Sequence, residues 1–434
     1  MREVADLREK TIKEYIMKII WLSNVLFPEA CSEIGVKAPS VGGWMASGAK
    51  MLLDYASDIE LVVVSLYDGK RLLCIDKYAI KYYLVPVGKG NKRYDEAKEA
   101  FLSDIINRER PQLVHIHGTE YPNSLACAKA AKNREVPVVV SIQGLVSVYA
   151  DYFMGGMSET AIRKTTTFKD ILRGNGLLAQ QKEMSRRGVY ERELIGSVSH
   201  VIGRTSWDKS CVWAINPKVK YHFCNETLRH AFYNTTWSWE RCERHTIFLS
   251  QGHYPIKGLH KVLEALPFVL RHYPETKIVL AGHKTLTMPV YRLSGYARYC
   301  MQLIEKNNLH NSIEYVGMLD EKAMAEQYAK AHVFVCPSSI ENSPNSVGEA
   351  QLVGTPVIAS YVGGSMDMVE DGKTGFLYRF EETPLLAMRI CEIFANRELC
   401  ETLSSNERLA AASRHDGETN AKQLIHIYND ILSR

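Results

Sequence analysis

The stretch from His332 to Ser360, HVFVCPSSIENSPNSVGEAQLVGTPVIAS, decides the fold that we predict for this chain. Its apolar runs 333–336 and 357–359 are typical of short buried parallel strands. Between them, an N-cap serine and a first-turn proline at 343–344 predict a helix start, and the Gly-Thr-Pro at 354–356 predicts its end. The helix therefore begins just beyond the carboxyl end of a strand, where open α/β sheets bind ligands.

The predicted helix start carries groups that suit an anionic ligand. Backbone N–H groups near Asn345 and Ser346, together with the positive end of the helix dipole, predict a site for an anion such as a diphosphate. Glu349 shares a helix face with Asn345, so its carboxylate can accept hydrogen bonds from vicinal hydroxyls such as those of a ribose. Glu341 lies in the preceding loop. The alternative is that both glutamates are solvated residues without a ligand.

These residues resemble a known family. The spacing Glu341-x7-Glu349, the GTPVIAS that follows and the later VGG and DGKTGFLY are similar to the donor-site half of retaining GT-B glycosyltransferases. The group is the large one of sucrose-synthase-like and mannosyltransferase-like enzymes, glycosyltransferase family 4. The segments ENSPNSVGEA (341–350) and FCNETLRHAFY (223–233) resemble its polysaccharide-assembly members. The resemblance implies an α/β fold of two Rossmann-like parallel-sheet domains that face each other across a cleft.

Length and composition agree with two α/β domains. A chain of 434 residues is too long for one core, and its 46% hydrophobic and 24% charged residues are ordinary globular values. The net charge of +4 is too small to argue for nucleic acid as a partner. The ten cysteines show no CxxC and no zinc spacing, which favours a reducing compartment. No apolar run approaches the roughly 18 residues of a membrane-spanning helix, so we expect a cytoplasmic protein.

We expect four segments along the chain. Residues 1–16 form a charged N-terminal extension, and residues 17–240 alternate strands and helices as an acceptor-binding Rossmann-like domain. Residues 241–415 alternate again as the nucleotide-sugar donor-binding domain, after an interdomain crossing placed at 237–243. Residues 416–434 form a C-terminal helix. The resemblance implies that this helix returns to the first domain.

The segment SQGHYPIKGLHKVLEALP (250–267) resembles the first strand and loop of the family's nucleotide domain. The family's lysine before a glycine, which binds the donor phosphates, is matched by Lys257. A diphosphate attracts such an ammonium strongly, since each charged hydrogen bond is worth about 1.5 to 3 kcal/mol. The family's arginine after the strand glycine, here Gly252, is replaced by His253. A protonated His253 would restore the charge as the pH falls from about 8 to 6.

Other residues are candidates for the missing charge or for sugar contacts. Arg204, at a strand end, and Arg229 are both candidates to supply the positive charge. Gln143 stands where many members place a histidine that touches the donor sugar, which predicts altered sugar choice. Of the two histidines in VHIHG, one is expected in the core, and His117 is the favoured ligand contact because it lies nearer the strand end. Gly43 either makes a turn or lets the backbone approach the donor diphosphate.

A long segment from 144 to 176 is predicted to be irregular and contains VSVYADYFMGGM (146–157). Between positions 163 and 187 there are seven Lys or Arg against two acidic residues. This composition is typical either of a solvated helical face or of a surface for an acceptor or an anionic membrane. We expect peripheral binding on the inner membrane face through this part of the first domain.

We therefore expect a retaining, metal-independent glycosyltransferase that moves a sugar from a nucleotide-diphosphate sugar to a glycan, in particular a lipid-linked glycan, in surface polysaccharide biosynthesis. A catalytically decayed nucleotide-sugar-binding subunit and a GT-B nucleotide-sugar epimerase are the alternatives. The chain has no DxD pair at a strand end, and the resemblance implies neither metal nor other cofactor. Glu341 and Lys257 are the catalytic candidates, and Gln143 and His117 are the acceptor or sugar contacts. The donor-binding candidates are Glu349, Asn345, Ser346, Ser343, Asn342, Gly252, His253, Gly43, Arg204 and Arg229.

Overall fold

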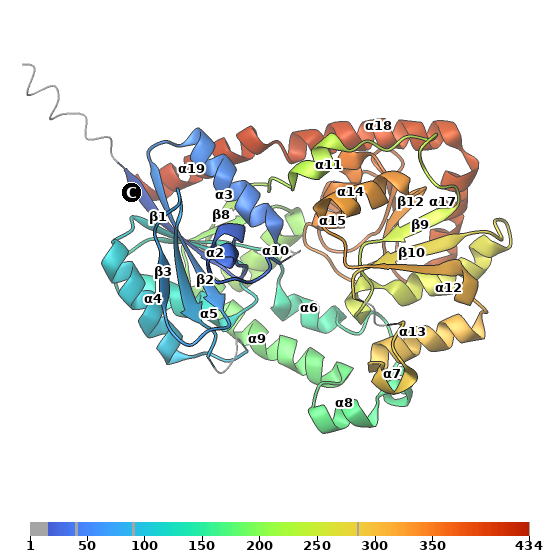
Figure 1. Cartoon of the computed structure of the whole chain (residues 1–434), viewed down its shortest axis with the longest axis horizontal. Helices are drawn as coiled ribbons and strands as arrows, with labels where there is room; N and C mark the ends of the chain where they lie inside the picture. The colour runs from blue at the N-terminus through green and yellow to red at the C-terminus, as the bar shows by residue number, and fades with distance from the viewer. Residues whose placement is uncertain (1–15, 40–41, 89–91, 284–285, 434) are drawn as a thin grey trace, which may run out of the picture.

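The computed structural model describes residues 16–39, 42–88, 92–283 and 286–433. It contains two β-sheets, each flanked by helices, that lie side by side along the long axis of the molecule (Figure 1). Most of the predicted extension, residues 1–15, and positions 40–41 of the predicted glycine loop lie outside the described residues. The two α/β halves confirm the predicted fold class of two Rossmann-like parallel-sheet domains.

The first sheet has eight strands in the order β3-β4-β2-β1-β5-β6-β7-β8. Every neighbouring pair is parallel except β3 and β4, which form an antiparallel edge. The strands are β1 (Met17–Ser23), β2 (Ile59–Tyr67), β3 (Leu73–Ile75), β4 (Lys81–Pro86), β5 (Leu113–His117), β6 (Val138–Ser141), β7 (His200–Gly203) and β8 (Lys220–Phe223). Its helices are α2 (Pro28–Glu33), α3 (Gly43–Tyr55), α4 (Glu96–Glu109), α5 (Pro122–Lys132), α6 (Val146–Tyr152), α7 (Glu159–Thr165), α8 (Phe168–Arg173), α9 (Leu177–Ser197) and α10 (Ser206–Ile215).

The second sheet has six parallel strands in the order β11-β10-β9-β12-β13-β14. The strands are β9 (Thr246–Leu249), β10 (Lys277–Ala281), β11 (Ile313–Gly317), β12 (Val333–Cys336), β13 (Val357–Ser360) and β14 (Phe376–Tyr378). The helices around it are α11 (His230–Asn234), α12 (Leu259–Leu270), α13 (Gly295–Lys306), α14 (Glu321–Lys330), α15 (Asn345–Val353), α16 (Ser365–Met368), α17 (Thr383–Ala395) and α18 (Arg397–Arg414). Short 3-10 turns occupy Pro255–Lys257, Val290–Arg292 and His310–Ser312.

Both faces of the first sheet are buried, because helices cover each of them. On β1, Ile20 and Leu22 pack into one apolar cluster, whereas Ile19 and Trp21 pack into another. This two-sided burial explains why the strand reads as a continuous apolar run instead of an alternating one.

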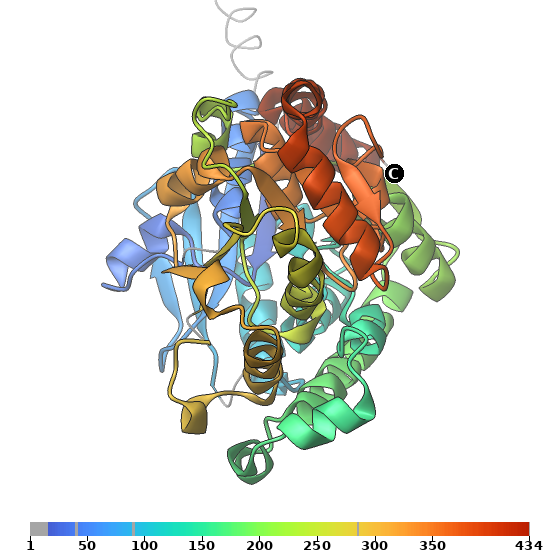
Figure 2. The ribbon, with the colours of Figure 1, turned by 90° about the vertical axis from the view of Figure 1, so that its right-hand side faces the viewer.

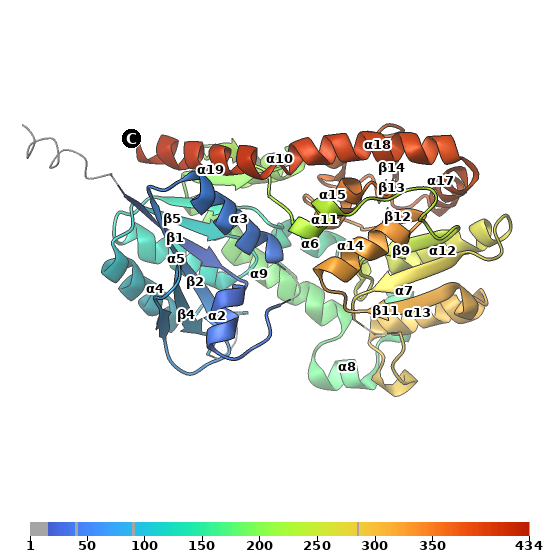
Figure 3. The same ribbon diagram turned by 45° about the horizontal axis from the view of Figure 1, so that its top comes forward.

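The last helix, α19 (Gly417–Leu432), continues the line of α18 and packs against the first sheet (Figures 1 and 3). The Tyr428 hydroxyl accepts a hydrogen bond from the Trp21 indole N–H at 2.9 Å and bonds His115 Nδ1 at 2.6 Å. The C-terminal helix thus ties the end of the chain to the first and fifth strands.

The chain passes between the two sheets earlier than the predicted crossing at 237–243. Leu228, Phe232 and Trp237 are all buried in the core of the second domain. The Trp237 indole N–H donates to Ala331 O at 2.8 Å. The prediction was wrong here because a polar, aromatic segment without clear periodicity can still bury its aromatic side chains.

The segment from 144 to 176 is helical, contrary to the irregular structure predicted for it. It forms α6, α7 and α8; Figure 1 places α6 between the two sheets, and Figures 1 and 2 show α7 and α8 at the lower edge of the molecule. Phe153 and Met157 are buried in the core of the second domain, so the VSVYADYFMGGM stretch bridges the two domains. It therefore cannot serve as a whole as the membrane surface that the sequence suggested.

Candidate active site

The first turn of α15 lies at the carboxyl ends of β12 and β13, where the sequence placed an anion site. The helix begins at Asn345 with Pro344 as the cap residue, so the prediction of Ser343 as a side-chain N-cap was wrong. Pro344 has φ −67 and ψ 109, an extended conformation that keeps it outside the helix. The Val347 N–H donates to Pro344 O at 2.9 Å. The N–H groups of Asn345 and Ser346 are therefore the candidates for an anionic ligand.

Lys257 and Glu341, the two catalytic candidates, form a buried ion pair with 2.5 Å between Nζ and Oε1. The Ser338 hydroxyl donates to the same carboxylate oxygen at 2.7 Å. Burial disfavours the charged ammonium, but the neighbouring Glu341 carboxylate outweighs that effect and raises the pKa of Lys257. Gly258 follows Lys257 with φ 66, and a Cβ there would lie 1.7 Å from Pro337 O. Only glycine fits at this position, so the chain geometry that presents Lys257 depends on it.

The glycines of the VGG motif hold the loop that carries Glu341. A Cβ on Gly363 would lie 1.9 Å from Glu341 O, and one on Gly364 would lie 1.9 Å from Asn342 O. The Gly364 N–H also donates to Glu341 O at 3.0 Å. The motif therefore contributes a close backbone approach that fixes residues 341–342.

Glu349 and Arg229 form a second ion pair, with 2.8 Å between Oε1 and Nη2. The Tyr328 hydroxyl donates to Glu349 Oε2 at 3.3 Å. Burial raises the pKa of Glu349, and the Arg229 guanidinium acts against that rise. Gly43 leaves the room that Arg229 needs, since a Cβ there would lie 2.9 Å from Arg229 Cδ. The structure thus brings together three candidates that are far apart in the sequence.

Arg204 and Gln143 meet at Glu226, a residue that sequence reasoning did not single out. Arg204 forms a buried ion pair with Glu226, and the Gln143 side-chain amide donates to Glu226 Oε1 at 2.7 Å. Arg204 also donates to Gln143 Oε1 at 3.4 Å. Asn345 Nδ2 donates to Glu226 Oε2 at 3.4 Å, and Asn342 Nδ2 donates to Gln143 O at 3.4 Å. These bonds join the first domain to the start of α15.

The two histidines of VHIHG are both buried, whereas the sequence analysis expected only one of them in the core, but their hydrogen bonding differs. His115 is fully engaged, with Nδ1 bonded to Tyr428 at 2.6 Å and Nε2 bonded to the Ser141 hydroxyl at 2.6 Å. His117 is also buried, but neither of its ring nitrogens has a hydrogen-bond partner among the described residues. Burial lowers the pKa of His117 to about 3, so its imidazole is neutral. Its free nitrogens can bond a ligand hydroxyl.

In the free protein, His253 is not the substitute cation that the sequence suggested for pH 6 to 8. Burial, followed by the charges of His283 and Lys257, lowers the pKa of His253 to about 4. The ring packs 4.6 Å from the Tyr254 ring and 5.0 Å from the His283 ring, measured between centroids. The free site therefore holds a neutral imidazole throughout that pH range, and donor binding would tighten between pH 8 and 6 only if the bound diphosphate raised the pKa of His253 into it.

Two cavities lie at this end of the sheets. An interdomain cavity of about 280 Å³ lies between the domains, and a first-domain cavity of about 60 Å³ lies at the strand ends of the first sheet. The interdomain cavity is lined by residues that include Gly43, Arg229, His253, Asn345, Ser346 and Glu349. The first-domain cavity is lined by residues that include Trp21, His117, Gln143, Arg204 and Glu226. Trp44 lines both cavities, so the two lie next to each other.

Lys257 and Glu341 line neither of these two cavities. Ser343, Asn342 and Gly252 likewise lie outside both linings. Helix α6 contributes Tyr149, a second residue that sequence reasoning missed; burial and then the Glu341 carboxylate raise its pKa. Glu226 and Tyr149 lie in segments that the sequence analysis did consider, 223–233 and 146–157, but neither side chain was singled out within them.

Among the described residues, no group of three or more His, Cys, Asp or Glu side chains could hold a metal ion. Within the same part of the chain, no helix is both long enough and apolar enough to cross a membrane.

Comparison with known proteins supports a glycosyltransferase as the class of protein that this fold and site suggest. Residues 237–410 match the family described as glycosyl transferases group 1. The spore coat protein SA of Bacillus subtilis is 28% identical over 175 residues, which cover 40% of this chain and 45% of that protein. A phosphatidyl-myo-inositol mannosyltransferase of Mycobacterium tuberculosis is 25% identical over 190 residues, 43% of this chain and 47% of that protein. Each match thus spans less than half of the curated relative.

Solved structures extend the likeness to nearly the whole chain at the level of the fold. The sucrose-phosphate synthase of Thermosynechococcus elongatus superposes with a TM-score of 0.68 and 16% identity, covering 96% of this chain and 99% of that one. The Anabaena Alr3699/HepE protein, solved in complex with UDP and glucose, superposes with a TM-score of 0.65 and 17% identity. The superposition covers 95% of this chain and 99% of that one. The chain therefore has the GT-B fold, and residues 237–410, most of its second domain, are similar in sequence to the group 1 glycosyl transferases.

Proposed function

We propose that the protein is a retaining glycosyltransferase that moves a sugar from a nucleotide-diphosphate sugar to a glycan acceptor. The observation that carries this proposal is the interdomain cavity, where Arg229, Glu349 and the first turn of α15 meet. Lys257 lies behind its lining, close enough to His253 for the ammonium to lower the pKa of that histidine. The group 1 match of residues 237–410 supports a glycosyltransferase, and the UDP bound to the Anabaena protein supports a nucleotide-sugar donor.

On the donor side, we assign Glu349 to the ribose hydroxyls and the N–H groups of Asn345 and Ser346 to the diphosphate. Arg229 lines the same cavity and pairs with Glu349 in the free site. We assign its guanidinium to a donor phosphate, which would compete with the Glu349 carboxylate for it. Lys257 supplies a second positive charge, and Glu341 positions the donor sugar. No protein nucleophile is assigned, and a leaving diphosphate that assists the acceptor hydroxyl is compatible with retention of the anomeric configuration.

On the acceptor side, we assign the first-domain cavity with His117 and Gln143. Its aromatic and polar lining suits a sugar ring, since a flat indole can lie against the ring while neutral imidazole and amide groups bond its hydroxyls. A lipid-linked glycan in surface polysaccharide biosynthesis fits this arrangement. The mannosyltransferase relative, whose name specifies phosphatidyl-myo-inositol, supports a lipid-linked acceptor.

We further propose that the reaction needs no metal or other cofactor and takes place in the cytoplasm. Lys257, Arg229 and the α15 N-terminus together can neutralise a diphosphate leaving group, which is the role that a divalent cation plays in other sites. Turnover that is unchanged by excess chelator and unaffected by added Mg²⁺ is the expected result.

A non-catalytic nucleotide-sugar-binding subunit is the second candidate. Lys257, Arg204 and Arg229 are each already paired with a carboxylate, and His253 is neutral, so the free site offers a diphosphate little uncompensated positive charge. Such a protein would bind nucleotide sugars without turning them over.

The test is a panel of nucleotide sugars incubated with the purified chain and glycan acceptors, followed by quantification of released nucleoside diphosphate and by NMR of the product anomer. We expect a product with the donor's anomeric configuration, and at least a hundredfold slower release in Lys257→Ala, on the scale of losing charged donors at a transition state. Lys261→Ala is the matched control, because Lys261 lies in α12, directly after the turn that ends at Lys257, and forms an ion pair with Glu264 at 3.1 Å. Binding without turnover would favour the second candidate, and an epimerised nucleotide sugar would overturn both.

A further inference from the structure

The two most exposed large apolar side chains of the described residues, Phe168 and Leu172, lie on α8 together with two further exposed ones on α8 and the start of α9. Phe168, Ile171 and Leu172 on α8 are 79%, 68% and 76% exposed, and Leu178 on α9 is 59% exposed. Buried apolar residues are the norm in a folded domain, and a cluster of four large exposed ones marks a contact surface. We call these four residues the α8 tip.

The α8 tip projects from the molecule instead of packing on either sheet. Figures 1 and 3 place α8 at the lower edge of the molecule, beyond α7 and α9. The start of the short helix is defined locally, since Thr167 and Asp170 form a capping box with bonds of 2.9 and 3.0 Å. Gly174 closes it with φ 58. The apolar residues are therefore presented by a defined structure.

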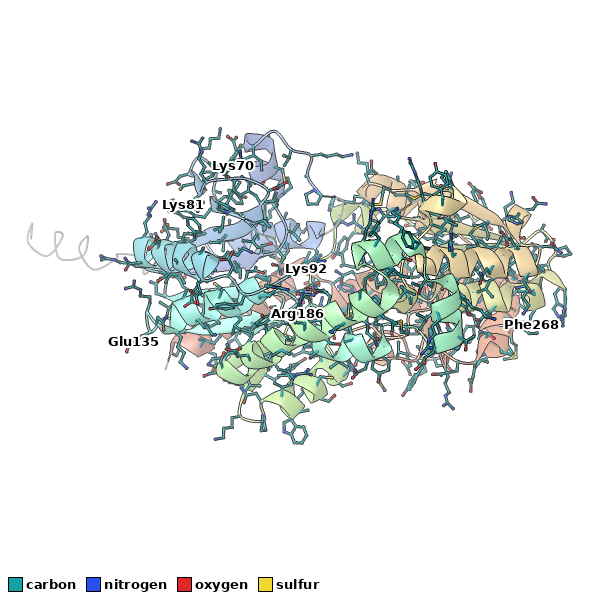
Figure 4. All side chains as sticks on the ribbon, turned by 90° about the horizontal axis from the view of Figure 1, so that it is seen from below. Lys70, Lys81, Lys92, Glu135, Arg186 and Phe268 are labelled. Atoms are coloured by element: carbon teal, nitrogen blue, oxygen red, sulfur yellow. The ribbon has the colours of Figure 1, made fainter. Side chains whose placement is uncertain are left out.

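Basic side chains surround the α8 tip. Lys164, Arg173 and Lys182 are exposed, and Lys169 is partly exposed; none of these four makes an ion pair within the described part of the chain. Arg186, which Figure 4 labels on the same side of the molecule, lies further along α9. The acidic groups nearby are already engaged, because Asp170 caps α8, and Glu159 and Glu183 pair with Arg163 and Arg186.

We propose that the α8 tip and its basic surround dock the protein on an anionic membrane surface. Apolar side chains that enter the acyl boundary, ringed by cations that face lipid headgroups, are the pattern of interfacial membrane binding. A second copy of the chain fits less well. Four side chains are too few for the roughly 1,200 Å² of a stable interface, and a symmetric contact would bring the two basic rings together. The nature of the acceptor, a lipid-linked glycan, rests on the proposed function, but docking is measurable without turnover.

The α8 tip is carried by residues 146–173, which form α6, α7 and α8 and which we call the α6–α8 arm. This arm also contacts the donor side of the second domain. The Ser339 hydroxyl, two residues before Glu341, donates to Tyr152 O at 2.9 Å, and His260 Nε2 bonds Gly155 O at 2.7 Å. Docking through α8 therefore fixes the orientation of both domains relative to the membrane, since the same arm packs in both.

The experiment is co-sedimentation of the full chain with vesicles of phosphatidylcholine alone or with added phosphatidylglycerol, at low and high salt. We expect binding only to the anionic vesicles, and binding that weakens with salt. Phe168→Ser/Ile171→Ser/Leu172→Ser and Lys164→Glu/Arg173→Glu should each reduce the partition coefficient at least tenfold, since one surface charge alone changes it about fivefold. Controls are Trp213→Ser/Leu409→Ser and Lys50→Glu/Lys218→Glu, which change exposed residues outside the α8 tip and should bind as the unchanged protein does.

Tip variants that bind anionic vesicles as tightly as their controls would overturn the proposal. So would equal binding to neutral vesicles, or a change in oligomeric mass on light scattering that tracks the tip substitutions. Calorimetric binding of UDP and GDP is measured on the same variants. Tip variants that bind nucleotide as wild type does but no longer bind vesicles support the docking surface. A wild-type protein that binds vesicles but binds neither nucleotide contradicts the proposed function and leaves the docking surface supported.

Discussion

At the scale of single residues, the candidate site consists of cations that each hold a carboxylate of their own. Lys257 pairs with Glu341, and Arg229 pairs with Glu349. A bound diphosphate must therefore compete with these carboxylates, which costs part of the attraction but keeps the buried charges paired when the site is empty. Substituting one partner leaves the other exposed to the full cost of burial.

Glu349→Ala should weaken binding of the nucleoside diphosphate about a hundredfold, because two charge-assisted contacts to the ribose are lost. The free energy of unfolding should fall by about 1 to 3 kcal/mol, since Arg229 loses its buried partner. Calorimetric titration and urea unfolding measure the two effects. Glu305→Ala, an exposed helical substitution in the same domain, is the control. An unchanged dissociation constant would contradict the ribose assignment.

His253→Gln should leave the pH dependence of nucleotide affinity unchanged between pH 8 and 6, because the pKa of His253 is about 4. Stability should differ instead. A histidine with a folded pKa below its unfolded value of about 6.5 binds fewer protons when folded, so its contribution is full above pH 6.5 and is lost as the pH falls toward 4. Wild type should therefore lose about 1 kcal/mol more unfolding free energy than the variant between pH 7 and 5. A nucleotide affinity that rises from pH 8 to 6 only in wild type would contradict this expectation and would show that the bound nucleotide raises the pKa of His253 into that range.

Local sequence patterns predicted which residues could contact a donor, but not which residues pair with them. Asn345, Glu349 and Arg229 do line one cavity. Glu226 and Tyr149 were missed because their contacts join segments far apart in the chain, and nothing local in the sequence encodes such a pairing. His253 was misjudged for the same reason, since its low pKa comes from burial and from His283.

At the scale of elements, the turn Pro255–Lys257 and the helix α12 that follows are joined by a glycine that cannot be replaced. Gly258 combines a positive φ of 66 with a Cβ position only 1.7 Å from Pro337 O. Strain of the backbone and a steric clash therefore act together at this position, and the clash lies between the turn that carries Lys257 and the loop that leads to Glu341.

Gly258→Ala should lower the free energy of unfolding by more than about 3 kcal/mol and abolish nucleotide binding, because the turn that carries Lys257 must move. Gly35→Ala is the matched control, since Gly35 has a similar φ of 69 and no atom within 4 Å of the added Cβ. It should cost only the backbone strain, about 1 to 2 kcal/mol, with nucleotide affinity unchanged. Urea unfolding and calorimetry check both; equal effects of the two substitutions would show that the clash is not felt.

Short helices were the elements that the sequence analysis missed. The α6–α8 arm has helices too short for an amphipathic period to stand out, and its glycines and aromatics are typical of loops. Its caps were legible, since Ser158 precedes α7 and Thr167 forms a capping box with Asp170. A capping residue that is not followed by a helical repeat of apolar residues indicates where a helix starts but not how long it is.

At the scale of the whole molecule, alternation of strands and helices was enough to predict two parallel sheets, but not how the domains contact each other. The Thr205 hydroxyl donates to Asn342 Oδ1 at 2.9 Å across the cleft. The Ser206 N–H and hydroxyl both donate to Asp367 Oδ2, at 3.1 and 2.9 Å. These polar contacts join the start of α10 to the second domain. The pairs could not be predicted from the sequence, because their partners lie far apart along the chain.

Asp367→Ala should open the cleft without unfolding the protein. Asp367 is exposed, so the loss of its bonds should change the free energy of unfolding by no more than about 1 kcal/mol. In the absence of nucleotide, the radius of gyration from small-angle X-ray scattering should rise above that of wild type, and a saturating nucleoside diphosphate should reverse the rise, because a ligand that contacts both domains favours the closed state. KM for the donor should rise several-fold while kcat changes little. Asp371→Ala is the control, since Asp371 accepts the Leu377 N–H at 2.8 Å within the second domain. If both variants scatter as wild type does with and without nucleotide, the Ser206–Asp367 contact does not set the domain orientation.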